Sequence, residues 1–256
     1  VALTIMQASR AKRLVEFCES VNDAMVVLVH VAMKLAPVGV AAILFKVVGT
    51  TGLSVLLALA AYAGVVLLGL LTHILITYAP VIVVVVRVSF LGFISAIRSA
   101  LVLAFSTSSS SATLPVSMEA CEDNLKISNE VTSFVLPIGA TVNMDGTALY
   151  QGVAAIFIAQ VYGLDLSLGD QITIVVSATM ASIGAAGVPG AGMLTLAMVL
   201  AAVGVPVQGV ALVIGVDRIL DMFRTATNVA GDGAVTLIVA SSAHDAPQEG
   251  SAESPE

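Results

Sequence analysis

The segment DRILDMFRTATNVAGD, residues 217–232, places charged and polar side chains inside an otherwise apolar C-terminal stretch. On a helix that turns about 100° per residue, these side chains fall within an arc of about 100°. They are called here the polar stripe and comprise Asp217, Asp221, Arg224, Thr225, Asn228 and Asp232. The opposite face carries apolar residues such as Ile219 and Phe223. The pattern predicts one helix, polar in front and apolar behind, within residues 209–240, which are long enough to cross a bilayer.

The charges of the polar stripe indicate a site. An ionisable side chain in a membrane helix costs roughly 3 kcal/mol on insertion scales, so the stripe is expected to face a cavity, a partner or an ion. The alternative is an ion pair between Asp221 and Arg224 that only holds helices together. One pair would not explain Thr225, Asn228 and Asp232 on the same face, which favours a binding site.

The composition predicts an integral membrane protein. Of 256 residues, 58% are hydrophobic and 11% are charged, with a mean hydropathy of +1.05. The net charge of −7 says little about partners, because residues 241–256 form an acidic polar tail that is expected to be disordered. Nothing indicates a nucleic acid. Cys18 and Cys121 lie in no metal or redox spacing, so we expect free thiols. A chain that opens on Val1 without an initiator methionine is typical of the C-terminal part of a longer protein.

Two long apolar segments open the chain. Residues 10–48 begin with a basic cluster and read as a helix that should kink at Pro37. Residues 52–86 predict a second spanning helix that ends at Arg87. His73, alone within it, is interpreted as a packed or interfacial residue.

Shorter apolar arms follow, broken by small residues. Residues 88–105 lead into the Ser/Thr-rich run 106–113 and then an arm to Cys121. A second such element consists of residues 170–181, the glycine-rich run 182–192 and residues 193–205. Most of these arms are too short to span a bilayer, so we interpret both elements as re-entrant helical hairpins with tips at membrane depth. A flexible linker and an ordinary loop are the alternatives for the two runs, but linkers rarely lie between apolar arms.

The hairpins belong to a repeat. Each precedes a helix with a polar middle: residues 134–162, interrupted at 143–147, and then the polar stripe helix. Paired broken segments of this kind point to a transporter site at the midplane between inverted repeats, where free carbonyls suit Na⁺ and backbone N–H groups suit a carboxylate. We therefore predict an all-α membrane protein in which residues 1–87 form two scaffold-type helices and residues 88–240 form a transport domain.

Charge placement supports several membrane crossings. With the basic cluster of residues 10–13 in the cytoplasm, alternate crossings place Arg87 and Lys126 on the same side. The outer loops then contain almost no basic residue, with Lys46 the main exception, as the positive-inside rule requires. A multi-pass protein of the cell membrane is expected.

Four motifs together resemble the sodium-coupled glutamate/aspartate transporters of the dicarboxylate/amino acid:cation symporter family. They are SSSSATLP at 108–115, NMDGT at 143–147, SIGAAGVPGAG at 182–192 and DMFRTATNVAGD at 221–232. The resemblance covers nearly the whole chain, from the fifth transmembrane helix to the eighth. It implies sodium-coupled symport of aspartate or glutamate by an elevator mechanism, in a homotrimer within the lipid bilayer.

The resemblance also implies which residues bind the substrate. It places the substrate amino group on Asp221, the side-chain carboxylate on Arg224 and the α-carboxylate near Asn228. Ser110, Thr147, Thr225 and the backbone of Val188 would complete the pocket. The chemistry agrees, since a guanidinium fork matches a carboxylate and a buried aspartate matches an ammonium.

Sodium sites are implied in the same way, all with oxygen ligands, as a hard cation requires. One would use Asp232 with carbonyls of Gly139, Asn143 and Asn228. A second would use Thr141 with carbonyls of Ser182, Ile183 and Ala185. A third would use Asn143 and Asp145.

The chain departs from the family pattern at several points. The first helices are absent, including the third, which supplies ligands to one sodium site. The family carries an arginine at the position of either Ser108 or Met222, and Arg218 is a candidate substitute. Gln151 stands where the proton- and potassium-coupled animal members carry a glutamate, which favours coupling to sodium alone.

Other functions remain as alternatives. A C4-dicarboxylate carrier of the same fold would lack an amine partner such as Asp221, and a neutral amino acid carrier would lack Arg224. A channel or a structural membrane subunit is a further alternative. An enzyme is least favoured, because no nucleophile paired with a base and no metal cluster is apparent.

Overall fold

The computed structural model describes residues 54–243 throughout, together with Gly52 and scattered residues between Lys12 and Gly49. Residues 1–46 and 47–256 form two compact units. In the first unit each described residue is helical, whereas the predicted kink at Pro37 lies outside the described residues, as does the tail after Ala243.

The second unit is helical, and no strand occurs within residues 54–243, which confirms the all-α class. Its elements are α3 (Ser54–His73), the π-helices η1 (Ile74–Tyr78) and η2 (Val81–Val86), α4 (Phe90–Ala96), α5 (Arg98–Thr107), α6 (Ser110–Asp123), α7 (Asn129–Val142), α8 (Asp145–Val161), α9 (Leu168–Ile183), α10 (Ala191–Ala202), the 3-10 turn η3 (Val207–Gly209) and α11 (Val210–Ser242).

One continuous apolar helix runs from Leu56 to Val86 and is long enough to cross a membrane. It combines α3 with two π-helical segments on either side of Pro80, whose missing N–H disturbs the α-helical hydrogen bonds. Arg87, in the left-handed region with φ 62°, ends it. A helix long enough to span a membrane therefore covers most of the predicted residues 52–86, and it ends at Arg87 as predicted.

The first hairpin consists of α5 and α6, which pack against each other. Its tip is tighter than the predicted run 106–113, because only Ser108 and Ser109 lie outside helices. Ser108 adopts the left-handed region with φ 54°, and the Ser109 hydroxyl caps α6 by accepting a bond of 3.1 Å from Ala112 N–H. The cap lets the helix begin at once, so most serines of the run are helical.

The second hairpin consists of α9 and α10, also in contact. Ser167 and Asp170 form a capping box at the start of α9, and residues 184–190 form a non-helical tip. Gly190 ends the tip at φ 78°, a conformation that glycine adopts without strain. Between the hairpins, α7 and α8 are separated only by Asn143 and Met144, so the predicted interruption is present but shorter.

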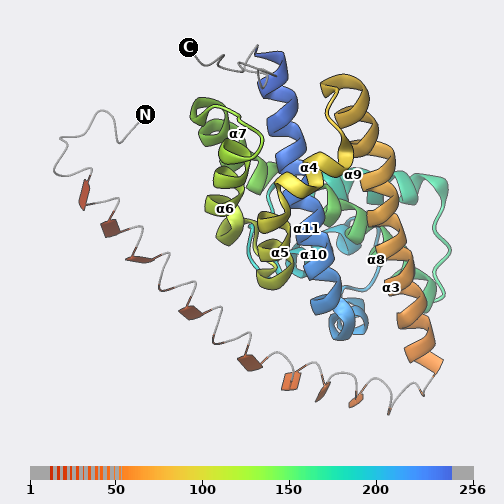
Figure 1. The fold of residues 1–256 in the computed structure, drawn as a ribbon. Coiled ribbons are helices and arrows are strands. Elements are labelled where there is room, and N and C mark those ends of the chain that lie inside the picture. The colour runs from red at the N-terminus through yellow and green to blue at the C-terminus, as the bar shows by residue number, and fades with distance from the viewer. Residues whose placement is uncertain are drawn as a thin grey trace, which may run out of the picture. The chain divides into compact units, whose positions relative to one another are not determined.

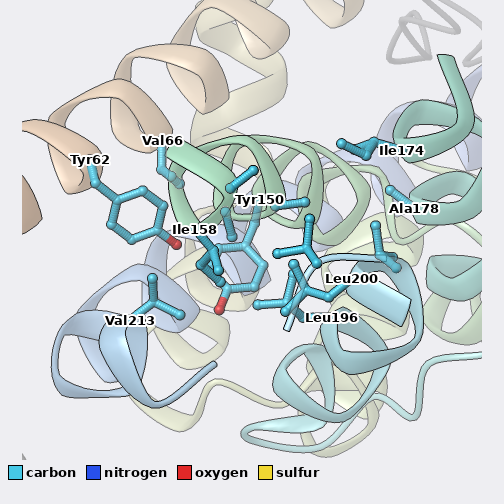
Figure 2. Packing of buried hydrophobic residues seen from close by; sticks show 14 of the residues in the cluster. Tyr62, Val66, Tyr150, Ile158, Ile174, Ala178, Leu196, Leu200 and Val213 are labelled. Carbon is cyan, nitrogen blue, oxygen red and sulfur yellow. The ribbon is translucent and has the colours of Figure 1, made fainter. Parts of the chain in front are cut away.

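Helix α11 is the central element (Figure 1). It contacts α3, α5, α6, α7, α8 and α10. An apolar cluster fills the space between α3, α8, α9, α10 and α11, with Tyr62, Tyr150 and Leu196 among its buried members (Figure 2). Alanines of α8 let neighbouring helices approach closely, which is how membrane helices pack. The polar stripe of α11 is thereby held inside the unit.

Candidate functional site

A small cavity lies between the two hairpin tips, the α7–α8 break and α11. Its volume is about 20 Å³, room for about one water molecule. All seven predicted substrate contacts line it: Ser110, Thr147, Val188, Asp221, Arg224, Thr225 and Asn228. The remaining lining residues are Ser108, Met144, Ala185, Ala186, Gly187, Ala191 and Gly192. Residues from distant parts of the sequence thus meet at one place.

The guanidinium of Arg224 occupies the centre of the polar stripe, with the side chain only 2% exposed. Its Nη2 donates to Asp221 Oδ1 at 2.5 Å, and its Nη1 donates to Asp217 Oδ1 at 3.3 Å. The Tyr150 ring lies 4.1 Å from the guanidinium carbon, an additional favourable contact for a buried cation. The ion pair considered as an alternative is therefore formed, but inside a cavity and with a second carboxylate.

Glycines at the end of the second tip and the start of α10 allow the second hairpin to approach Arg224. A Cβ at Gly192 would lie 3.0 Å from the guanidinium carbon, so a larger residue at the start of α10 would require the guanidinium to shift. The Gly190 N–H donates to Asp221 Oδ2 at 3.0 Å. Both oxygens of Asp221 are thus bound, one by the arginine and the other by the tip of the second hairpin.

The two hairpin tips are joined directly. The Ser109 hydroxyl donates to the Gly187 carbonyl oxygen at 2.7 Å, and the Ser111 N–H donates to the same oxygen at 3.1 Å. A Cβ at Gly187 would lie 2.6 Å from Ser111 Oγ and 3.1 Å from the Ala140 carbonyl oxygen. These contacts close the cavity over the polar stripe.

A second polar group, called here the break cluster, surrounds the α7–α8 break. It contains five of the predicted sodium ligands: Gly139, Asn143, Asp145, Asn228 and Asp232. Asn143 Nδ2 donates to Asp232 Oδ1 at 3.1 Å, and a Cβ at Gly139 would lie 2.7 Å from the same oxygen. Gly146 N–H donates to Asn228 Oδ1 at 2.8 Å and to Asp145 Oδ1 at 2.9 Å. The cluster combines two carboxylates with amide and backbone groups, the oxygen-rich composition that a hard cation prefers.

The remaining predicted sodium ligands lie around the second tip. Thr141 is exposed and donates its hydroxyl to the Ile138 carbonyl at 3.1 Å. Ser182 and Ala185 are buried, whereas Ile183 is 41% exposed. Among the described residues, no hydrogen bond joins Thr141 to Ser182, Ile183 or Ala185. This ligand set stays a prediction.

Three residues at these sites carry contacts that the sequence reasoning missed. His73 was interpreted as packed or interfacial, yet its Nε2 lies 2.6 Å from Asp145 Oδ2. The sequence places Asp217 in the polar stripe without indicating its role, and it indicates no role for Tyr150. Tyr150 could have been found, because it follows Thr147 by one turn of a helix. No sequence signal connects residue 73 with residue 145.

The positions that depart from the family pattern are placed as follows. Ser108 lines the cavity, whereas Met222 and Arg218 are not among the residues that line it. Gln151 is fully buried and donates to the Gly192 carbonyl at 3.4 Å and to the Thr195 hydroxyl. It therefore ties α8 to the start of α10.

The chain matches one protein family and is similar to several named transporters. Residues 1–242 match the model of the Sodium:dicarboxylate symporter family. The chain is 46% identical to mouse excitatory amino acid transporter 3 over 88% of the chain and 43% of the relative. It is 48% identical to human excitatory amino acid transporter 1 over 85% of the chain and 40% of the relative. It is also 49% identical to a putative sodium-dependent excitatory amino acid transporter of Caenorhabditis elegans, over 74% of the chain and 38% of the relative. The chain spans less than half the length of these curated relatives.

Proposed function

The chain belongs to the Sodium:dicarboxylate symporter family, and from that premise we propose that it contributes the substrate and cation sites of a sodium-coupled carrier of acidic amino acids. The observation that carries the proposal is the adjacency of Asp221 and Arg224 in the cavity, in contact at 2.5 Å. A ligand that bridges both must present a cation to one and an anion to the other. Aspartate and glutamate do so through an ammonium and a distal carboxylate.

Substrate binding exchanges one set of ion pairs for another. Without substrate, Arg224 is paired with two carboxylates, those of Asp217 and Asp221. We propose that the substrate carboxylate takes over the guanidinium fork while the ammonium takes over Asp221. Asp217 then remains beside the arginine as a permanent counter-charge. The exchange gives the guanidinium, Asp221 and both ends of the bridging substrate an ionic partner, while the α-carboxylate depends on hydrogen bonds near Asn228.

The cavity must open to admit an amino acid, because its volume of about 20 Å³ holds only one water. The second tip, residues 184–190, is the longest non-helical part of the cavity boundary. It is held by the Gly187 carbonyl and by the Gly190 N–H bond to Asp221. A substrate ammonium competes for Asp221, so we propose that this tip is the gate.

Sodium is proposed to bind at the break cluster and around the second tip. Asn228 supports coupling between ions and substrate, because its side chain lines the cavity and also accepts a bond from Gly146 N–H next to Asp145. Its Nδ2 donates to the Thr147 hydroxyl at 3.1 Å. A cation that orders the break cluster thus orders one wall of the substrate cavity.

We propose the membrane arrangement from the exposure of apolar side chains, the length of the helices and family membership. Large apolar side chains cover the exterior, for instance Leu57, Leu91 and Leu194 at 77%, 80% and 77% exposure, which fits contact with lipid. The short helices α9 and α10 fit a re-entrant hairpin. Family membership supports two inverted repeats, an elevator movement of the hairpins with α7, α8 and α11, and a homotrimer.

Uptake into liposomes tests the proposed function. We expect the complete protein, reconstituted with an inward sodium gradient, to accumulate labelled aspartate and glutamate, and not to do so when choline replaces sodium. Labelled succinate and alanine in parallel vesicles identify the substrate class. Preferential uptake of succinate would indicate a dicarboxylate carrier, and flux that never exceeds equilibrium would indicate a channel; either result rejects the proposal.

The gate can be tested with two glycines of the same tip. A methyl group at Gly187 would collide with Ser111 and the Ala140 carbonyl, whereas nothing lies within 4 Å of a Cβ at Gly184. We expect Gly187→Ala to shift the distance between spin labels on the two hairpins toward longer values, with and without substrate. Gly184→Ala should behave as the parental protein, closing when substrate is added. Equal distances in the two variants would show that the tip contact does not hold the gate.

A further inference from the structure

The π-helix η1 brings a buried phenol to the break cluster. Tyr78, its last residue, is 8% exposed, and its hydroxyl oxygen is fully buried. That hydroxyl has no hydrogen-bonding partner within residues 54–243. Buried polar groups in folded proteins are almost always bound to protein, water or an ion, so an unpartnered hydroxyl calls for a ligand.

The surroundings of this hydroxyl are those of the predicted cation ligands. A Cβ at Gly231 would collide with the Tyr78 hydroxyl and would lie 2.6 Å from Asn143 Nδ2, so phenol and amide converge on the same face of α11. The next residue, Asp232, accepts a bond of 3.1 Å from that amide. Because Gly231 has no side chain, the phenol oxygen can reach this point.

The same segment also contacts the second carboxylate. His73 lies edge-on to the Tyr78 ring with 4.9 Å between ring centroids, and its Nε2 is 2.6 Å from Asp145 Oδ2. The stretch from His73 to Tyr78 therefore forms a wall of the break cluster. From this wall a histidine nitrogen contacts Asp145, and a phenol oxygen lies beside Gly231, where the Asn143 amide that binds Asp232 also lies.

We propose that the Tyr78 hydroxyl is a further ligand of the sodium ion bound at Asn143 and Asp232, an inference that rests on the proposed function. A phenol oxygen is a neutral oxygen donor with free lone pairs, which suits a hard monovalent cation. It adds no charge to the break cluster, which already holds two carboxylates. The ring itself packs in the apolar cluster with Ile82 and Phe93, so the oxygen is the part of the side chain that packing does not require.

Tyr78→Phe separates the two roles, because it keeps the ring and removes only the oxygen. The complete protein is purified, and its melting temperature is measured from zero to saturating sodium chloride, with choline chloride holding the ionic strength constant. A ligand that binds the folded state raises the melting temperature as its concentration rises, so the curve gives the half-saturating sodium concentration. We expect Tyr78→Phe to raise that concentration about tenfold, a typical loss when a group supporting a metal site is removed.

Tyr62→Phe is the matched control. Its hydroxyl is also buried without a hydrogen-bonding partner in the described part of the chain, but its ring stacks on Phe157 at 4.8 Å in the other apolar cluster. This variant should keep the parental half-saturating concentration. If Tyr78→Phe also keeps it, the phenol oxygen is no ligand and the inference fails while the proposed function stands. A parental protein with no sodium response would reject the proposed sodium site itself.

Discussion

Arg224→Cys is expected to abolish uptake of aspartate and glutamate and to permit uptake of serine or alanine. The guanidinium is the cation that lines the cavity, and it lies beside Asp221. Without it, the distal carboxylate of an acidic substrate would be buried without a partner. Loss of a buried partner costs about 3–5 kcal/mol, which corresponds to at least a hundredfold in affinity. A short neutral amino acid carries no such carboxylate and still finds Asp221 for its ammonium.

The measurement is a competition series in proteoliposomes with labelled aspartate, glutamate, serine and alanine. Gained uptake of a neutral amino acid also proves that the variant folds, although Asp217 and Asp221 have lost their counter-charge. Asp221→Ser is the companion variant and should lose every amino acid. Arg224→Lys keeps the charge but not the two-pronged geometry, so we expect a raised KM for aspartate without uptake of alanine.

One outcome would reassign the carboxylate site. If Arg224→Cys takes up aspartate with the parental affinity, the distal carboxylate is bound elsewhere. Arg218 is then the next candidate, although it does not line the closed cavity. Its Nη1 is buried without a hydrogen-bonding partner among the described residues, so a movement of the hairpins could give it one.

The polar stripe was predictable because it depends only on helical periodicity. The six members lie on one continuous helix, and each is at most 5% exposed. The sharing of Arg224 between Asp217 and Asp221 was not predictable in the same way. Spacing of three and seven residues permits both contacts, but their choice depends on side-chain conformations and on Gly190, which occupies the other oxygen of Asp221.

The hairpins show a different limit of prediction from the sequence. A serine-rich run looks like an irregular segment, since serine competes with helical hydrogen bonds, and an eight-residue tip was expected. In the structure Ser109 acts as a cap and the following serines continue as helix. Ser108, the left-handed residue of this tip, reverses the chain. Propensity could not reveal which serine takes the cap.

Contacts between distant segments could not be predicted from the sequence. His73 and Asp145 are 72 positions apart, and neither composition nor spacing marks them as neighbours. The π-helical turns after His73 change the direction in which Tyr78 points, and a window that assumes 3.6 residues per turn cannot detect that change. The resemblance to a family identified the carboxylates of the break cluster but not the wall that faces them.

Substitution of either carboxylate of the break cluster should also have a large effect. We expect Asp232→Asn and Asp145→Asn each to raise the sodium concentration needed for half-maximal aspartate binding by at least tenfold. Asp232 is 4% exposed and contacts Asn143, while Asp145 lies beside the Gly146 N–H that reaches Asn228. Asparagine preserves size and removes the charge. Because coupling between two ligands is reciprocal, apparent aspartate affinity should fall at fixed sodium and recover as sodium is raised.

Two further variants help to interpret the sodium dependence of aspartate binding. Gly139→Ala changes no charge but places a methyl group 2.7 Å from Asp232 Oδ1, so it should also weaken sodium binding. Asp165→Asn, which removes an exposed carboxylate from the loop between α8 and α9, should leave the sodium dependence unchanged. Calorimetric titration of aspartate at several sodium concentrations provides the measurement. If both Asp232→Asn and Asp145→Asn retain the parental sodium dependence, the break cluster does not bind the ion, and coupling must arise from the residues around the second tip.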